Sequence, residues 1–336
     1  MGRTLSGWLL ARALRVPESV ATLDAAGWNG VIAMARAEQM IGTLAWRLVD
    51  VPVPAQVARI LDDACASVAQ TQVAVLWEAE AARRVILPLG VPLVLLAGAA
   101  FAAGGMRAGV GRWVDDLEIL VPGERMDAVE AALLGAGWER VERDRYDDGC
   151  ARTGVPGHSS MIHRERGRRI DIHLTILPPT VCAAPDPTPC LADIRAVAPG
   201  MFALSANDCL LHAAVRLFST GGLAGGMRIL WDVQGLVAEF GTDGLASHAQ
   251  RHGRAHAVAR ALRLAEALYG DAKRVTRVDR LYLHRITARD GWGRPTRSLV
   301  RMAFHIRAQC LGMSPARVRQ YGSLIWGKGG ARPASV

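Results

Sequence analysis

The chain has little lysine, few aromatic residues and no long hydrophobic run. Of its 40 basic residues only Lys273 and Lys328 are lysines, and aromatic residues make up 5% of the 336-residue sequence. The longest apolar run, at residues 93–103, contains a glycine and is too short to span a bilayer. We therefore predict no membrane-spanning helix, and few aromatic side chains on which nucleic-acid bases could stack.

Several motifs that define familiar protein classes are absent as well. The six cysteines form no C-x-x-C pair and no spacing typical of a disulfide framework, so we expect reduced thiols and a cytoplasmic protein. The N-terminal residues lack the apolar segment of a signal peptide. The glycines at residues 104–105 and 109–111 are not followed by G-K-[ST], and G-x-G-x-x-G does not occur. The Walker and Rossmann phosphate motifs are therefore excluded.

Two short predicted strands carry acidic side chains on one face. Residues 116–121 read D-L-E-I-L-V, so Asp116 and Glu118 point to the same side, and Asp115 points to the other. Residues 169–174 alternate in the same way and place Asp171 and His173 on one face. Adjacent carboxylates on buried strands are costly unless a cation lies between them, and hard oxygen ligands suit Mg²⁺ or Mn²⁺. We therefore predict a metal site at Asp116, Glu118 and Asp171.

These stretches, in this order, resemble the uncharacterised bacterial nucleotidyltransferase family of the polymerase-beta-like superfamily. That family shows "vLLKGaal", then "R-x-x-x-D-x-D-LLV" and then "vDlHw". Here residues 94–100 read V-L-L-A-G-A-A, residues 112–121 read R-W-V-D-D-L-E-I-L-V, and residues 170–173 read I-D-I-H. Residues 204–212 and 228–232 are similar to helical segments of the family, and the resemblance covers about residues 55–270.

The resemblance implies an enzyme that transfers a nucleoside monophosphate from a triphosphate, such as ATP, to a hydroxyl group of an acceptor. Asp116, Glu118 and Asp171 would hold the Mg²⁺, and Asp171 could also take the proton from the attacking hydroxyl. Four further residues would contact the nucleotide, through backbone N–H groups at a helix start or through side chains: Gly98, Ala99, Arg112 and His173.

Two departures from the family pattern leave an alternative open. Ala97 stands where the family has a lysine after the first strand, and Glu118 stands where it has a second aspartate. Arg112 or Arg107 could supply the missing positive charge, and a glutamate can reach a metal with a small shift. The alternative is a catalytically degenerate module that binds nucleotide or peptide.

The acceptor is not specified by the residues. Some relatives are associated with lasso-peptide biosynthesis, which suggests a peptide acceptor. Others resemble toxin components, which suggests RNA, and a small molecule is equally compatible. We favour a peptide or small molecule over nucleic acid because the chain offers few aromatic platforms.

Positive charge is concentrated in the last part of the chain. Residues 251–336 carry a net charge of +14, whereas the whole chain carries +9. Such an asymmetry suits a polyanionic partner, although a solvated arginine-rich face is the simpler interpretation. On the last predicted helix, Arg297, Arg301 and Arg307 are the candidate contacts. A stripe of Leu299, Met302 and Ile306 would then face the protein.

The order of predicted elements indicates an α/β (α+β) protein with a small mixed-sheet core. We expect an N-terminal helical region at residues 1–85 and a nucleotidyltransferase core at residues 86–180. A proline-rich linker at 181–203, a C-terminal helical domain at 204–326 and a disordered tail at 327–336 would follow. The polar, glycine-rich stretch at 144–157 predicts a loop that could cover the substrate.

Three histidines are spaced four residues apart on a helix predicted to run from about residue 245 to 269. His248, His252 and His256 would share one face and could ligate zinc. No H-E-x-x-H motif accompanies them and Gly253 interrupts the turn, so we interpret them as an ordinary exposed or half-buried face. His158 and His163 precede the Asp171 strand and could contact substrate, but histidines in such positions are usually solvated.

Overall fold

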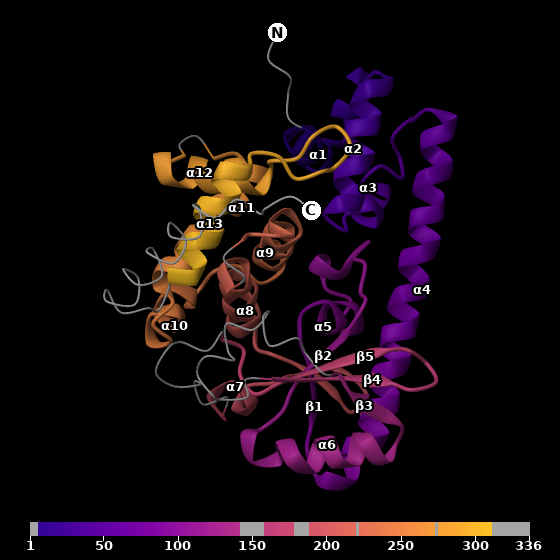
Figure 1. Cartoon of the computed structure of the whole chain (residues 1–336), viewed down its shortest axis with the longest axis vertical. Coiled ribbons are helices and arrows are strands. Elements are labelled where there is room, and N and C mark those ends of the chain that lie inside the picture. The colour runs from indigo at the N-terminus through magenta and orange to yellow at the C-terminus, as the bar shows by residue number, and fades with distance from the viewer. Residues whose placement is uncertain (1–5, 142–157, 178–187, 220–221, 273–274, 311–336) are drawn as a thin grey trace, which may run out of the picture.

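The computed structural model describes residues 6–141, 158–177, 188–219, 222–272 and 275–310. A mixed sheet with flanking helices confirms the predicted α+β class (Figure 1). The predicted substrate loop, the predicted tail and the first part of the predicted linker lie outside the described residues.

The sheet contains seven strands among the described residues, in the order β3-β4-β5-β2-β1-β7-β6. Their bounds are β1 Leu93–Leu95, β2 Leu117–Leu120, β3 Trp138–Arg140, β4 His158–His163, β5 Arg169–His173, β6 Arg195–Ala198 and β7 Met201–Ala203. The central strand β2 pairs with β1 antiparallel and with β5 parallel, and β1 pairs with β7 parallel. The two acid-bearing strands predicted from the sequence are therefore neighbours.

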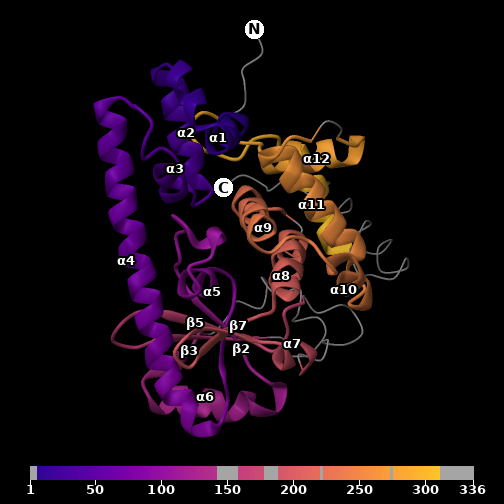
Figure 2. The ribbon, with the colours of Figure 1, turned by 180° about the vertical axis from the view of Figure 1, so that it is seen from behind.

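Alternation along β2 and β5 separates an apolar face from a polar one. Four side chains of the apolar face are fully buried: Leu117, Ile119, Ile170 and Ile172. Helix α6 (Met126–Gly135) packs against β3 on one side of the sheet, whereas α5 (Ala97–Ala103) lies on the other, with helix α8 (Ala206–Ser219) beside it (Figures 1 and 2). The acid-bearing face is the one that α8 reaches, because Arg216 of α8 contacts Glu118.

The N-terminal region is helical, as predicted. It contains α1 (Ser6–Arg15), α2 (Ala25–Ala37), α3 (Ile41–Arg47) and the 32-residue α4 (Ala55–Ile86), which is about 48 Å long. Helix α4 runs from the N-terminal helices to the level of α6 (Figure 2). Its buried side chains follow a helical period and include Val57, Leu61, Ala64 and Val68. This helix therefore joins the N-terminal helices to the sheet.

Helices also follow the sheet. They are α7 (Thr188–Ala192), α8, α9 (Gly226–Phe240), α10 (Leu245–Arg251), α11 (Ala255–Tyr269), α12 (Arg277–Ile286) and α13 (Ser298–Cys310). Ser205 caps the start of α8, because the Asp208 backbone N–H donates to the Ser205 hydroxyl at 3.3 Å and that hydroxyl donates to the Asp208 carboxylate at 2.8 Å. Helix α12 was not predicted from the sequence.

The expected linker is wrong over its second part. Residues 195–203 form strands β6 and β7, and β7 extends the sheet by pairing with β1. The prolines that suggested a linker lie outside both strands, and Pro199 occupies the turn between them, where its missing N–H costs no ladder bond. The core sheet therefore extends to Ala203.

The predicted single helix over residues 245–269 is also wrong. It is two helices, α10 and α11, separated at Gly253, whose φ of +64° lies in the left-handed region. His248 and His252 belong to the first helix and its cap, whereas His256 lies on the second and is exposed. The three histidines therefore do not share a continuous helical face.

The predicted orientation of α13 requires a correction. Leu299 and Met302, expected to face the protein, are 77% and 52% exposed, whereas Phe304 is buried. Phe304 packs edge-to-face on Tyr282 of α12, with ring centroids 5.0 Å apart. The helix is rotated because the unpredicted α12 provides the surface that it covers.

A buried ion pair fastens α4 to the turn between β4 and β5. Arg166 donates from Nε and Nη2 to the two carboxylate oxygens of Glu78, both at 2.8 Å, and Glu78 is almost fully buried. We expect Glu78→Gln to lower the free energy of unfolding by about 2–3 kcal/mol, because it leaves the arginine without its charged partner. Urea denaturation measures this loss.

Glu139→Gln is the control, because Glu139 and its partner Arg164 are both more than half exposed. Exposed pairs contribute little, so this variant should unfold almost like the parent protein. Equal losses in the two variants would contradict a specific role for the Glu78–Arg166 pair.

Candidate functional site

The three predicted acids lie on the polar face of β2 and β5, although their carboxylate oxygens do not all come within 4.8 Å of one another. Glu118 and Asp171 are direct partners in the parallel register, and Asp116 immediately precedes β2. All three side chains are half-buried. The parallel pairing of the two strands thus brings residues 53 positions apart in the sequence into one cluster.

Glu118 is held by a cation from the helical region. Arg216 of α8 donates from Nη1 to both carboxylate oxygens, at 2.8 and 3.0 Å, and His173 Nε2 lies 3.5 Å from Oε2. Burial raises the pKa of Glu118, but Arg216, His173 and His212 outweigh it and hold the pKa well below its ordinary value. Glu118 is therefore ionised at neutral pH.

Asp116 and Asp171 lie in a different electrostatic environment. Burial, and next the negative charge of Asp171, raise the pKa of Asp116 above its ordinary value. Asp171 accepts a hydrogen bond from the Ser160 hydroxyl and another from Arg169 Nε at 3.1 Å. A carboxylate whose pKa is raised by burial and by a like charge would gain from a divalent cation bound beside it.

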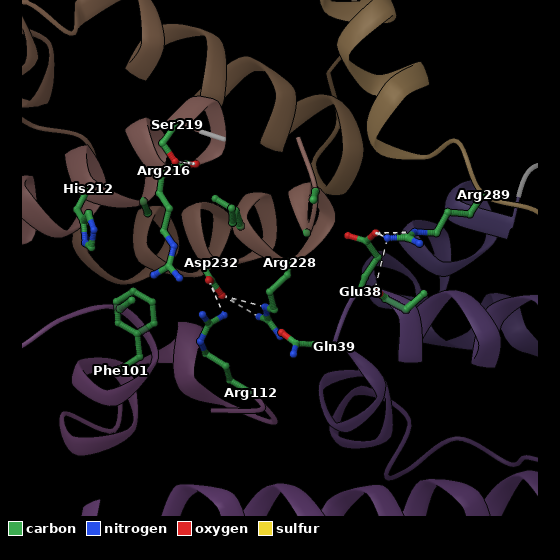
Figure 3. A pocket seen from close by; sticks show the side chains of 16 residues that line it. Glu38, Gln39, Phe101, Arg112, His212, Arg216, Ser219, Arg228, Asp232 and Arg289 are labelled. Atoms are coloured by element: carbon green, nitrogen blue, oxygen red, sulfur yellow. Dashed lines mark hydrogen bonds and ion pairs between the residues drawn. The ribbon is translucent and has the colours of Figure 1, made fainter. Parts of the chain in front are cut away.

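A cavity of about 450 Å³ lies beside the acid cluster, between the sheet-side helix α5 and helices α8 and α9 (Figure 3). Its polar lining includes four arginines and two carboxylates: Arg112, Arg216, Arg228, Arg289, Glu38 and Asp232. Arg216 lines the cavity and also binds Glu118, so it connects the cavity to the acids. A volume of this size accommodates a ligand as large as a nucleotide.

Asp232 organises two of the arginines. Arg112 Nη1 donates to Asp232 Oδ2 at 2.6 Å, and Arg228 Nε donates to Oδ1 at 3.0 Å (Figure 3). Arg228 Nη1 donates to the Thr43 hydroxyl at 2.6 Å. Burial lowers the pKa of Arg112 to about 10, against the opposing effect of Asp232. Arg112 therefore stays charged at neutral pH.

The loop that carries Arg112 is pinned to the N-terminal helices. Gln72 Nε2 of α4 donates to the carbonyls of Gly109 and Arg112, at 2.8 and 3.0 Å. Gly111 has a φ of +62°, and a Cβ there would lie 2.5 Å from the Gly42 carbonyl oxygen. Only glycine fits this close approach, so α3 and α4 together fix the position of the Arg112 backbone.

Glu38 and Arg289 close the far end of the cavity (Figure 3). Arg289 Nε donates to Glu38 Oε1 at 2.8 Å, and the Met227 backbone N–H donates to Oε2 at 3.3 Å. Burial raises the pKa of Glu38, and Arg289 opposes that effect. The cavity is thus bounded by residues from the N-terminal helices, the sheet region and the C-terminal helices.

Of the four residues predicted to contact the nucleotide, two lie at the acids or the cavity and two do not. His173 lies beside Glu118, and Arg112 lines the cavity, but Gly98 and Ala99 are buried and do not line it. A Cβ on Gly98 would lie 2.9 Å from Arg112 Nε, so the arginine covers this end of α5. Arg107 is exposed and does not line the cavity, so it does not supply the missing charge there.

Of the polar cavity residues, only Arg112 had a predicted role. Residues 204–212 and 228–232 were matched only as helical segments, and the structure places His212, Arg216, Arg228 and Asp232 in the cavity lining. The pKa of His212 falls to about 3 through burial and the nearby Arg216, so this imidazole is neutral at physiological pH. Polar residues at four-residue spacing on an otherwise apolar α8 were the available signal.

A family model for an uncharacterised nucleotidyltransferase matches residues 24–270. The chain belongs to this family. The match includes the three acids and all the polar cavity residues except Arg289, and it ends before α12 and α13. No curated protein and no solved structure matches the chain. None of the described helices of this nucleotidyltransferase family member has the length and apolar character needed to cross a membrane.

The ion pair between Arg216 and Glu118 predicts a pH-dependent stability. We expect Arg216→Met to lower the free energy of unfolding by about 2 kcal/mol at pH 7, because a half-buried carboxylate loses its charged donor. The folded-state pKa of Glu118 is depressed, so the stabilisation is complete above the ordinary value of 4.5 and is lost as the pH falls below it. Urea denaturation at pH 7, 5 and 3 should show the difference between parent and variant narrowing.

Arg164→Met provides the comparison, since Arg164 pairs with an exposed partner. It should change the stability little at any of these pH values. A loss in Arg216→Met that stays constant down to pH 3 would show that packing, and not the charge of Glu118, causes it.

Proposed function

We propose that this protein is a divalent-metal-dependent nucleotidyltransferase that moves a nucleoside monophosphate from a triphosphate to a hydroxyl group of an acceptor. The observation that carries the proposal is the cluster of Asp116, Glu118 and Asp171 beside an arginine-lined cavity. The family match supports nucleotidyl transfer in general. The polymerase-beta-like ancestry and the use of ATP belong to the same proposal.

The cavity would hold the triphosphate. Its four arginines exceed its two carboxylates, so the lining attracts a polyanion. Arg112 and Arg216 flank the start of α5, where Ala97 replaces the lysine of the family pattern. We propose that these two arginines supply the positive charge that position 97 lacks.

The carboxylates fit a hard divalent cation, Mg²⁺ or Mn²⁺. Asp116 and Asp171 lie on the same polar face, burial and next the charge of Asp171 raise the pKa of Asp116, and both would hold the ion with Glu118 as a third ligand. The bound ion would neutralise charge on the triphosphate and on the leaving pyrophosphate. Asp171 would accept the proton of the attacking hydroxyl, and Arg216 would turn from Glu118 to phosphate.

A second function has specific support. Glu118 already binds Arg216 and Asp171 already binds Arg169, so two of the three acids are compensated without a metal. This arrangement suits a module that binds nucleotide or peptide and does not turn it over. For either function we propose that the acceptor or ligand is a peptide or a small molecule and not nucleic acid. Two of the basic residues that could contact a nucleic acid already have partners within the chain: Arg297 donates to His284, and Arg307 lies over the Tyr282 ring.

Substitution of the acids tests catalysis. We expect Asp116→Asn and Asp171→Asn to reduce pyrophosphate release and label transfer from each α-labelled triphosphate by at least about 100-fold with Mg²⁺ or Mn²⁺. The reason is that each change removes a charged ligand at the reacting phosphate. The assay should include pooled peptides and small hydroxyl compounds as acceptors.

Asp115→Asn is the matched control for these variants. Asp115 is the exposed neighbour of Asp116, was not predicted to bind the metal, and accepts a hydrogen bond from Gln39 Nε2 at 3.0 Å. It should retain the parent rate. Turnover that persists in both acid variants would remove the three-acid site from the mechanism.

Nucleotide binding distinguishes the two functions. We expect Arg216→Gln to weaken triphosphate binding by about 10-fold, because one charge-assisted contact to phosphate is lost. Isothermal titration with each of the four ribonucleotides, with and without Mg²⁺, measures the affinities, and Arg164→Gln is the control. Tight binding by a parent protein that releases no pyrophosphate would favour the binding module.

A further inference from the structure

A cluster of metal-ligating side chains lies outside the acid cluster and the cavity. Asp208, near the start of α8, meets His248 of α10 and His252 at the end of α10. One ligand atom from each residue lies within 4.8 Å of the other two. It is the only such group of three found in the part of the chain that the structure describes.

The carboxylate of this cluster is fixed in orientation. The Asp208 side chain is 4% exposed, and its Oδ2 accepts a hydrogen bond from the Ser205 hydroxyl at 2.8 Å. This leaves Oδ1 directed at His248 Nε2, 2.7 Å away, with the Cys190 thiol donating toward the same oxygen at 3.7 Å. A ligand held in this way loses little freedom when a metal binds.

The two imidazoles are also brought together by the fold. The rings of His248 and His252 lie with their centroids 4.7 Å apart, because the residues are one helical turn apart at the end of α10. The helix ends here, because the Gly253 backbone N–H donates to the Gln250 carbonyl and Gly253 adopts a left-handed conformation. His252 therefore lies beside His248, whereas His256 belongs to the next helix. The break that removed the predicted three-histidine face thus leaves two of the histidines beside an aspartate.

We propose that Asp208, His248 and His252 bind a zinc-like divalent transition-metal ion. Two imidazole nitrogens and one carboxylate oxygen match the mixed ligand sets of zinc, whereas Mg²⁺ favours oxygen alone. Three protein ligands leave the fourth tetrahedral position to water. The site would fasten the start of α8 to α10.

One contact must change when the ion binds. Arg251 Nη2 lies 3.1 Å from His248 Nδ1, an arrangement in which Nδ1 accepts and Nε2 carries the proton. A metal on Nε2 moves that proton to Nδ1, where it would face the guanidinium. Arg251 is exposed and can turn into solvent, so the competition weakens the site without blocking it.

The site is separate from the proposed catalytic one but shares a helix with it. Asp208 precedes Arg216 by eight residues, which is about 12 Å along α8. His212 and Arg216, on the turns between and beyond, line the cavity. A metal at the start of α8 would therefore stabilise the helix that presents both cavity residues.

Zinc titration of the untagged, EDTA-treated full chain tests the proposal. Competition with a chromogenic chelator should give one Zn²⁺ per chain in the parent protein. His252→Ala should weaken binding by about 100-fold or more, because one of three ligands is lost. The matched control is His256→Ala, an exposed histidine on the other side of Gly253, which should bind within about 2-fold of the parent.

Thermal unfolding gives a second measurement that does not depend on the chelator. Zn²⁺ binds the folded state, so it should raise the Tm of the parent protein and of His256→Ala, but not that of His248→Ala or His252→Ala. Millimolar Mg²⁺ should leave the Zn²⁺ affinity unchanged. Equal Zn²⁺ affinity in the parent and His252→Ala, or a Zn²⁺-dependent Tm shift that persists in both histidine variants, would overturn the proposal.

Discussion

Four buried or half-buried carboxylates in this protein are paired with arginine, and these pairs hold distant parts of the fold together. Each pair joins segments that are distant in the sequence: Glu118 with Arg216, Asp232 with Arg112, Glu78 with Arg166, and Glu38 with Arg289. A carboxylate taken from water is costly unless a cation with good geometry replaces the lost hydration. The planar guanidinium provides several fixed donors and stays charged when buried, which a lysine ammonium does less well. The scarcity of lysine thus agrees with the use of arginine as the partner of these carboxylates.

The need to pair a half-buried carboxylate with a cation also determines how Glu118 is held when no ligand is bound. Glu118 lies on the sheet face that α8 covers, and Arg216 satisfies it there. A triphosphate in the cavity would compete with Glu118 for this arginine, because both are anions within its reach. Binding of the nucleotide and release of Glu118 toward a metal would then be linked. The Glu118–Arg216 ion pair, which satisfies the glutamate when no nucleotide is bound, is therefore compatible with a catalytic role. It does not by itself indicate a degenerate site.

Local patterns in the sequence were sufficient to predict the strands that carry the acids and most of the helices. Alternation placed Asp116, Glu118 and Asp171 on polar faces, and the parallel pairing of β2 with β5 brought them together. Patterns could not supply partners that come from distant segments, such as Arg216, which is 98 positions from Glu118. The exposed side of α13 was mispredicted for a related reason. Which apolar stripe is buried depends on the neighbour, and that neighbour, α12, had no recognised pattern.

Position 97 shows why a motif comparison alone can misjudge such a site. Ala97 stands where the resembling family has lysine, and its φ of +45° is a conformation that costs a non-glycine residue about 1 kcal/mol or more. The backbone is therefore held by its surroundings, between β1 and the buried α5. Arg112 reaches this point from a loop pinned by α3 and α4, and Arg216 reaches the same cavity from α8. In the proposed function, the positive charge that a motif would place in the strand-to-helix turn would come from these two arginines, so the absence of the lysine would remove a residue without removing the charge.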